Sequence, residues 1–296
     1  MAILTIEDLS KDYGAVRALN KVSFAVPEKT VFGILGPNGS GKTTLLGIVM
    51  DILKVTSGSY SWTGHTDTDA MRKKIGTLLE TPNFYHYLSG ENNLRIAARI
   101  KGKGEADIPK VLKMVNLYER RDSKFNTYSL GMKQRLAIAS TLLGDPEILV
   151  FDEPTNGLDP AGIAEIRELI KALNRQGKTI IMASHILDEV EKVCTHAAIL
   201  KTGNLITTGN VEEIMMDEDI VEVSANDLNA LATLINQSGK KITIDEKANT
   251  IQIVFPRGTA KMDEINRFCF DNGVVLTQLV LRKKRLETRF FELTNN

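Results

Sequence analysis

Gly36-Pro-Asn-Gly-Ser-Gly-Lys-Thr43 has the pattern of a phosphate-binding loop, which is Gly, any four residues, then Gly-Lys-Ser or Thr. Such a loop needs a strand before it and a helix after it. Val31–Leu35 is a short apolar run that favours a strand, and Gly41–Asp51 has the residue pattern of a helix. The glycines let successive backbone N–H groups point at a phosphate, and the helix N-terminus adds its dipole. The stretch therefore predicts a nucleotide site on an α/β fold.

An acidic motif ends the strand expected at Ile148–Phe151, because Asp152 and Glu153 follow directly. A carboxylate at that strand end lies beside the phosphate loop and can hold Mg²⁺, which is the role expected of Asp152. Glu153 can point at the γ-phosphate and polarise the attacking water. Lys42 is expected to reach the β- and γ-phosphates, and the Thr43 hydroxyl to ligate Mg²⁺. The alternative is that the two acids only cap the turn after the strand.

Strands and helices alternate through about the first 210 residues, and several of the strands are continuous apolar runs. Such runs are typical of a mainly parallel sheet that is covered by helices on both faces. The expected strands are Ala2–Glu7, Val22–Val26, Val31–Leu35, Tyr60–Trp62, Ile75–Leu79, Ile148–Phe151 and Thr179–Ala183.

The residue pattern changes after about residue 217, where the expected elements follow in the order βαββαβ. We therefore expect a first domain over residues 1–217 and a small α+β accessory domain over 218–296. The accessory domain offers no phosphate loop, no paired carboxylates at a strand end and no metal-ligand spacing, so it is expected to do no chemistry. Its strands are expected at Ile220–Ser224, Ile242–Ile244, Ile251–Phe255 and Val274–Leu281, and its helices around Leu228–Ile235 and Met262–Cys269.

The charge balance argues against a broad surface for nucleic acid. The chain of 296 residues has 37 Lys plus Arg and 37 Asp plus Glu, so its formal net charge is zero. Apolar residues make up 43% of the chain, which is enough for a packed core and excludes wholesale disorder. The two cysteines, Cys194 and Cys269, support neither a disulfide framework nor a zinc pattern, and we expect buried free thiols in a reducing compartment.

A membrane span is not expected, because no apolar run approaches the roughly 20 residues that a spanning helix needs. The N-terminal stretch Met1–Asp8 carries acids where a signal peptide has basic residues and an apolar block. We therefore expect a cytoplasmic protein. If it works at a membrane, another polypeptide must supply the span.

Four further features resemble the ATP-binding-cassette (ABC) ATPases. Tyr128-Ser-Leu-Gly-Met-Lys-Gln-Arg135, at the start of a helix before the acidic motif, resembles their signature motif. Asn156–Asp159 resembles their D-loop, and His185 after the next strand resembles their switch histidine. Tyr13 lies where that family stacks an aromatic ring on adenine. In isolation, Tyr13 is more often a packed surface aromatic and His185 an ordinary strand-end histidine, but their order along residues 1–216 favours the family.

The resemblance implies a P-loop ABC ATPase core with a helical subdomain over about residues 82–142. It implies that two such domains, of this chain or of a close relative, clamp two ATP molecules head to tail. The phosphate loop of one domain then faces the signature motif of the other. Integral-membrane permease subunits are the implied partners, and ATP and Mg²⁺ the implied cofactors.

The resemblance also assigns roles to individual residues. The implied catalytic residues are Lys42, Glu153 and His185, and the implied metal ligands are Thr43, Asp152 and Glu80. The residues implied to bind ATP are Tyr13, Gly36, Pro37, Asn38, Gly39, Ser40, Gly41, Lys42, Thr43, Thr44, Ser129 and Gly131.

Two departures from the family pattern point to one of its branches. The usual signature Leu-Ser-Gly-Gly-Gln is replaced by Tyr128–Met132, which puts Leu130 where a glycine backbone would approach the nucleotide. Where a glutamine is expected after the strand at Ile75–Leu79, the chain has Glu80. Both variants resemble the exporter branch of bacitracin and lantibiotic self-protection ATPases. The ending Arg285–Thr294 resembles the close of multidrug-type ABC ATPase subunits.

These patterns favour the ATP-hydrolysing subunit of an exporter, peripheral on the inner face of the cell membrane. The alternative is a non-transport ABC ATPase that acts on nucleic acid or the ribosome. Chromosome ATPases of this family carry long coiled coils between the two nucleotide motifs, and the ~110 residues between Lys42 and Asp152 leave no room for them. Ribosome-acting relatives carry two cassettes, whereas this chain has one phosphate loop. A small-molecule phosphotransferase would need no signature motif, and we expect no nucleic-acid partner.

The segment Thr81–Arg95 after Glu80 is expected to dock the permease, because in the family this loop joins the two subdomains. Phe84, Tyr85 and Tyr87 cluster there, and aromatic side chains suit an interface. The alternative is that these rings pack under the loop.

Overall fold

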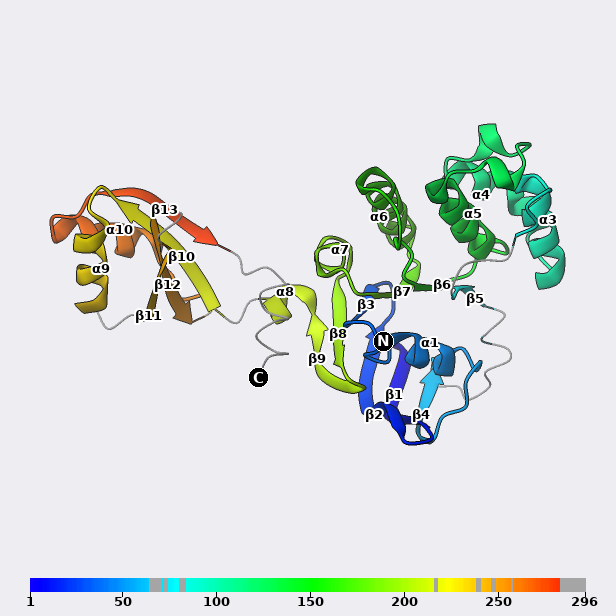
Figure 1. The fold of residues 1–296 in the computed structure, drawn as a ribbon, viewed down its shortest axis with the longest axis horizontal. Helices are drawn as coiled ribbons and strands as arrows, with labels where there is room; N and C mark the ends of the chain where they lie inside the picture. Colours follow the sequence, from blue (N-terminus) through cyan, green and yellow to red (C-terminus); the bar gives the residue numbers. More distant parts are fainter. Residues whose placement is uncertain are drawn as a thin grey trace. The chain divides into compact units, whose positions relative to one another are not determined.

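The computed structural model describes residues 1–63, 71, 74–79, 84–215, 218–237, 241–245, 249–256 and 258–282. The chain divides into two compact units, the first over Met1–Val211 and the second from Glu212 onward. The first unit has two sheets and the second has one, and each unit has its own core, so each is described by itself (Figure 1).

The centre of the first unit is a six-stranded sheet. Its strands in order across the sheet are β5 (Ile75–Leu78), β6 (Ile148–Asp152), β7 (Thr179–Ser184), β3 (Val31–Leu35), β8 (His196–Lys201) and β9 (Asn204–Asn210). The first five run parallel, and β9 pairs antiparallel with β8. Strands β3, β6 and β7 are buried along their whole length, as a sheet covered on both faces requires. The predicted α/β fold with a mainly parallel sheet is confirmed.

Helix α1 (Lys42–Val49) lies between this sheet and a second sheet (Figure 1). The second sheet is antiparallel and contains β2 (Val16–Pro27), β1 (Ala2–Tyr13) and β4 (Ser57–Trp62), in that order. Because α1 is covered on both sides, its apolar residues are buried all round, and Leu45, Leu46 and Ile48 are completely inaccessible to solvent. The helix that follows the phosphate loop is therefore anchored in the main core.

The opposite face of the six-stranded sheet is covered by α6 (Pro160–Arg175) and α7 (Leu187–Val193) (Figure 1). The Asp159 carboxylate caps α6 by accepting a hydrogen bond from the Gly162 N–H at 3.0 Å, and Pro160 occupies the first turn, where its missing N–H costs nothing. Helix α8 (Val211–Met215) follows β9.

Three helices form a separate part of the first unit: α3 (Gly90–Lys101), α4 (Ile108–Met114) and α5 (Leu130–Leu142) (Figure 1). Serines cap two of them in the same way. The Ser89 hydroxyl accepts from the Asn92 N–H at 3.2 Å, and the Ser129 hydroxyl accepts from the Met132 N–H at 3.3 Å. These helices lie within the range expected for the helical subdomain.

The second unit has the predicted element order βαββαβ. Its elements are β10 (Glu218–Ala225), α9 (Leu228–Gln237), β11 (Lys241–Asp245), β12 (Thr250–Pro256), α10 (Met262–Asp271) and β13 (Leu276–Arg282). The strands form one antiparallel sheet in the order β11-β12-β10-β13. Val221, Val223, Ile251 and Ile253 from the sheet pack with Ile235 of α9 to form a small core.

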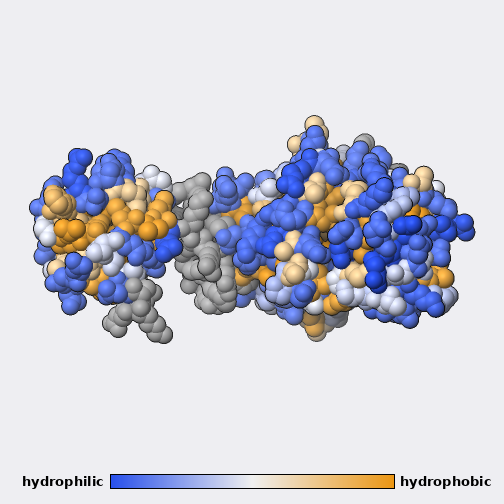
Figure 2. Space-filling model, turned by 90° about the horizontal axis from the view of Figure 1, so that it is seen from above, coloured by the Kyte–Doolittle hydropathy of each residue, from blue (hydrophilic) through white to orange (hydrophobic). Residues whose placement is uncertain are grey.

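Apolar side chains also reach the surface of the second unit, and Figure 2 shows them gathered on the face in view. Among the described residues of this unit, five large apolar side chains are at least 40% exposed: Ile244, Phe268, Phe270, Val275 and Leu281.

Two further observations concern the described helices and the two cysteines. None of the helices in these ranges is long and apolar enough to cross a membrane. Cys194 and Cys269 are buried free thiols, as predicted, and burial raises the pKa of both. Both cysteines therefore lack the exposure and the low pKa of reactive thiols.

Candidate nucleotide site

The phosphate loop between β3 and α1 folds around the ammonium group of Lys42. Gly41 has a φ of 103°, and a Cβ at that position would lie 2.6 Å from the carbonyl oxygen of Ala18, so only glycine fits there. The Lys42 Nζ donates hydrogen bonds to the carbonyl oxygens of Gly36 at 2.8 Å and Pro37 at 3.3 Å. With the side chain only 6% exposed, the loop holds a buried cation at the N-terminus of α1. Both features favour an anionic phosphate group.

The groups expected to hold Mg²⁺ are of the right chemical kind. The Thr43 side chain is exposed at the start of α1, and Asp152 ends β6 with 9% of its surface exposed. Hydroxyl and carboxylate oxygens are the ligands that Mg²⁺ prefers in phosphate sites. The Ser40 hydroxyl oxygen is also buried in the loop and has no hydrogen-bond partner among the described residues.

Glu153 joins the phosphate loop to the end of β7. Its Oε1 lies 3.5 Å from Lys42 Nζ, and its Oε2 lies 2.8 Å from His185 Nδ1. The Glu153 φ of 48° is in the left-handed region, which costs a residue other than glycine about 1–3 kcal/mol. The Glu153 N–H donates to the Ala183 carbonyl oxygen at 3.0 Å and so fixes this conformation against β7. The structure thus brings together the three predicted catalytic residues.

Tyr13 and the signature motif lie elsewhere on the first unit. Tyr13 ends β1, is 47% exposed, and has the Lys11 ammonium 4.9 Å from its ring centroid. Ser129 caps α5, as described above, and a Cβ built on Gly131 meets no atom within 4 Å. Within the described ranges, neither Tyr13 nor Ser129 forms a hydrogen bond or ion pair with Lys42. Tyr13 and Ser129 therefore make no direct polar contact with the lysine of the phosphate loop.

Leu130, which replaces the first glycine of the usual signature, contacts the D-loop. Its side chain is 53% exposed, and its Cδ2 lies 3.3 Å from where a Cβ on Gly157 would stand. Gly157 has a φ of 75°, which a residue with a side chain rarely adopts. The leucine therefore connects the start of α5 with the turn that follows Glu153.

The aromatic residues after Glu80 divide into a packed ring and two exposed rings. Glu80 itself lies outside the described residues, so its role as a metal ligand stays a prediction. Phe84 packs edge-to-face against Phe125, with 5.2 Å between ring centroids. Tyr85 and Tyr87 contact each other at 5.9 Å and are 47% and 68% exposed. Phe84 therefore packs against a neighbouring ring, as in the alternative given above, whereas the two tyrosines lie at the surface.

A buried acid that the sequence did not single out lies on α7, near enough to Glu153 for the two charges to interact. Glu189 on α7 is 3% exposed, and its Oε2 accepts a short hydrogen bond from the Thr155 hydroxyl. Its Oε1 is buried and has no hydrogen-bond partner among the described residues. One sequence pattern could have indicated that Glu189 is buried, because it shares a helix face with the buried Val193, four residues later.

Burial raises the pKa of Glu189, although the hydrogen bond from Thr155 and the charge of Arg167 oppose this shift, and Glu153 and Asp188 add to it. Folding therefore favours the protonated form, and ionisation costs stability as pH rises above the unfolded pKa. We expect Glu189→Gln to raise the melting temperature more at pH 8 than at pH 5. Thermal unfolding at the two pH values measures this difference. An equal shift at both would contradict it.

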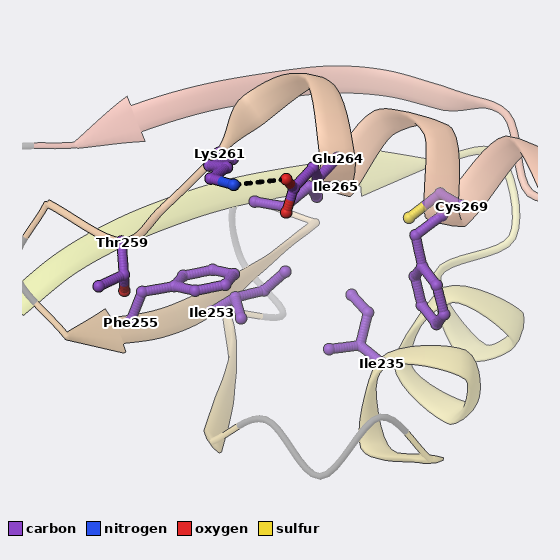
Figure 3. Close-up of a pocket in the computed structure, with 9 residues that line it drawn as sticks. Ile235, Ile253, Phe255, Thr259, Lys261, Glu264, Ile265 and Cys269 are labelled. Atoms are coloured by element: carbon purple, nitrogen blue, oxygen red, sulfur yellow. Dashed lines mark hydrogen bonds and ion pairs between the residues drawn. The ribbon is translucent and has the colours of Figure 1, made fainter.

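The second unit contains a hollow of about 270 Å³ beside α10 (Figure 3). Ile253 and Phe255 of β12 and Ile235 of α9 face it, and Cys269 lies at one side. The Lys261 ammonium donates to Glu264 Oε1 at 2.7 Å near its edge. Because its walls are mostly apolar and its cation is already paired, the hollow is unsuited to a phosphate group.

Comparison with known proteins agrees with this geometry. The family model described as "ABC transporter" matches residues 19–156. The chain is 36% identical to the uncharacterized ABC transporter ATP-binding protein YhcH of Bacillus subtilis over 298 aligned positions, which cover 99% of this chain and 96% of the relative. The chain belongs to the ABC transporter ATP-binding proteins. Another ABC relative, the bacitracin transport ATP-binding protein BcrA of Enterococcus faecalis, is 33% identical over 98% of this chain and 96% of its own length.

Solved ABC cassettes share the fold of the first unit. The ADP conformation of MJ1267, an ATP-binding cassette of an ABC transporter, matches with a TM-score of 0.65 at 27% identity and covers 72% of this chain and 92% of that one. The cassette MJ0796, described as a dimeric post-hydrolysis state bound to ADP and Pi, matches with a TM-score of 0.62 at 28% identity over 70% of this chain and 98% of that one. The protein is accordingly an ATP-binding, ATP-hydrolysing transporter subunit.

Proposed function

We propose that this ABC subunit hydrolyses ATP at the Lys42–Glu153–His185 cluster, in a two-chain nucleotide sandwich that drives a separate permease. The observation that carries the proposal is the position of the Glu153 carboxylate, which contacts both the cation of the phosphate loop and the histidine at the end of β7. A carboxylate in that position can accept a proton from a water that attacks the terminal phosphate.

Each residue of the cluster then has a distinct task. The loop N–H groups and the Lys42 ammonium bind the phosphates and stabilise the negative charge of the transferring group. Glu153 orients the water and takes its proton, and His185 holds the Glu153 carboxylate in place through its Nδ1. Thr43 and Asp152 would hold Mg²⁺, which supplies charge neutralisation at the phosphate oxygens when bound. Glu80 is proposed as a further ligand of this ion.

The sandwich is proposed because the predicted ATP-binding residues fall into two groups on one chain. Lys42 lies at the start of α1, whereas Ser129 and Gly131 lie at the start of α5, in a different part of the first unit (Figure 1). In a head-to-tail dimer the α5 N-terminus of one chain would face the γ-phosphate held by the other. The dimeric description of the related MJ0796 cassette supports this arrangement.

Light scattering of the hydrolysis-impaired Glu153→Gln protein tests the sandwich. We expect the mass to double on addition of ATP, and we expect a second substitution, Ser129→Arg, to prevent the doubling, because a bulky cation at the α5 N-terminus blocks the facing nucleotide. Ser129→Arg also removes a helix cap worth about 1 kcal/mol.

Ser89→Arg is the matched control, because Ser89 caps α3 with the same geometry outside the signature motif. It should lose the cap and still dimerise with ATP. A species that stays monomeric at saturating ATP with the permease present would contradict the sandwich. Equal failure of both arginine variants would assign the effect to the caps.

We further propose that the subunit is cytoplasmic, docks on the inner face of the membrane through a permease, and works in export of a peptide antibiotic or similar drug. The exposed Tyr85 and Tyr87 are suited to that contact. Two kinds of relative support the cargo class: the bacitracin transport protein above, and the lantibiotic transport ATP-binding protein SrtF of Streptococcus pyogenes, 37% identical over 74% of this chain and 99% of its own length.

A further inference from the structure

Two hydrogen bonds join the segment after β6 to the segment after β7. The first is the contact between Glu153 and His185. The second is the bond from the Thr155 hydroxyl to Glu189, two residues further along one segment and four residues further along the other. The first pair is partly open to solvent, whereas Thr155 and Glu189 are each 3% exposed. The buried bond therefore joins the same two segments as the pair to which we assign catalysis.

A buried bond of this kind fixes geometry more firmly than an exposed one. Water cannot replace either partner without entering the core, so opening the bond leaves two buried polar groups unsatisfied. The Thr155 carbonyl oxygen also accepts from the Leu158 N–H at 3.2 Å, so the same residue shapes the D-loop turn. Glu189 is on α7, which begins two residues after His185, so the bond ties the helix that follows the imidazole to the turn that follows Glu153.

We propose that the buried Thr155–Glu189 hydrogen bond sets the spacing of Glu153 and His185 and thereby positions both for ATP hydrolysis. Glu189 is in this sense a positioning residue, since it acts through Thr155 and touches neither phosphate nor water. The inference rests on the proposed function, namely that Glu153 and His185 carry the hydrolysis.

The physical consequence is a selective loss of turnover. The phosphate loop, Lys42 and Tyr13 are not part of this bond, so ATP should still bind when the bond is removed. A misplacement of about 1 Å in catalytic groups can cost on the order of 100-fold in rate. The defect should therefore appear in kcat rather than in KM.

Steady-state ATPase kinetics of the full chain test the proposal with paired variants. Thr155→Val and Glu189→Leu each remove the bond at similar volume, and each should lower kcat about 10- to 100-fold with KM for ATP within about twofold of the parent. Thr155→Ser and Glu189→Gln keep a donor and an acceptor, and should each restore kcat to within about threefold. The double variant Thr155→Val/Glu189→Leu should be no slower than the slower single variant, because both remove one interaction.

Asp188→Asn is the matched control on the same helix. Asp188 is exposed and pairs with Lys192 at 2.6 Å, so this variant removes a carboxylate from α7 and should leave kcat unchanged. If Glu189→Leu does not fold, as judged by ATP binding and thermal unfolding, the comparison of Thr155→Val with Thr155→Ser decides the question.

The possible results distinguish a failure of the positioning role from a failure of the proposed catalytic role of Glu153. An unchanged kcat in Thr155→Val would overturn the positioning role. A Glu189→Gln protein as slow as Glu189→Leu would also overturn it, because the charge and not the hydrogen bond would then matter. If Glu153→Gln itself hydrolyses ATP at the parental rate, the proposed function fails, whatever the Thr155 and Glu189 variants do.

Discussion

Replacing Glu153 by glutamine is expected to lower ATP turnover by about 100- to 1,000-fold while ATP still binds. The amide has the shape of the carboxylate but cannot accept a proton, and it carries no charge for Lys42 at 3.5 Å. The phosphate loop itself is unchanged, because Lys42 keeps its bonds to Gly36 and Pro37. Phosphate release measures turnover, and isothermal titration with ATP measures binding.

Glu168→Gln is the control for this substitution. Glu168 is an exposed acid on α6 that pairs with Lys171 at 3.4 Å, so its loss changes the net charge equally and should leave turnover unchanged. If the Glu153 variant keeps parental turnover, Glu153 does not act on the attacking water. If it loses ATP binding instead, its main role is to hold the loop lysine.

The positions of Glu153 and His185 at strand ends could be predicted from the sequence because local patterns determine them, whereas their hydrogen bond is seen only in the structure. Both residues directly follow buried apolar runs, and neighbouring parallel strands end at the same edge of a sheet. The pairing of β6 with β7 shows that these two strand ends are adjacent, because Asp152 lies opposite Ala183. The phosphate loop is equally local, since its glycine spacing dictates the backbone that surrounds Lys42.

Strand β1 shows where sequence patterns fail. The sequence predicts a strand only over Ala2–Glu7, because the polar residues that follow resemble a loop, whereas β1 continues to Tyr13. The continuation depends on β-bulges in its pairing with β2, and Asp8 has a positive φ of 46° at one of them. A bulge puts polar residues into a strand without the regular alternation of faces, so periodicity cannot detect it.

Glu189 was missed for a different reason. An acid on a short helix is normally solvated, and only the fold shows that Thr155 meets it. Burial of a polar pair is a property of two segments that lie 34 positions apart, so it depends on the way the sheet is assembled. The same holds for Leu130 and Gly157, whose contact depends on the docking of α5 against the turn after β6.

Replacing Lys42 by methionine is expected to lower the affinity for ATP by about 10- to 100-fold. Methionine keeps the unbranched apolar stem, so the loss is that of the ammonium group, which lies 2.8 Å from the Gly36 carbonyl oxygen and 3.5 Å from Glu153. A hydrogen bond to a charged group contributes about 1.5–3 kcal/mol, which corresponds to the expected factor. Titration with ATP and with ADP measures the affinity, and the deficit should be larger for ATP because the lysine reaches the γ-phosphate.

The chain offers a matched control for this buried lysine. Lys178 is 8% exposed and donates to Asp145 at 2.8 Å and to the Pro146 carbonyl oxygen at 2.6 Å, at the start of β7 and away from the phosphate loop. Lys178→Met also removes a buried ammonium and leaves acceptors unsatisfied, so it should lower the melting temperature without changing ATP affinity. Lys42→Met also leaves buried acceptors unsatisfied and should lower the melting temperature as well, but of the two variants it alone should lower the ATP affinity. An affinity loss of equal size in both variants would mean that general destabilisation, rather than the missing phosphate contact, causes the effect at Lys42.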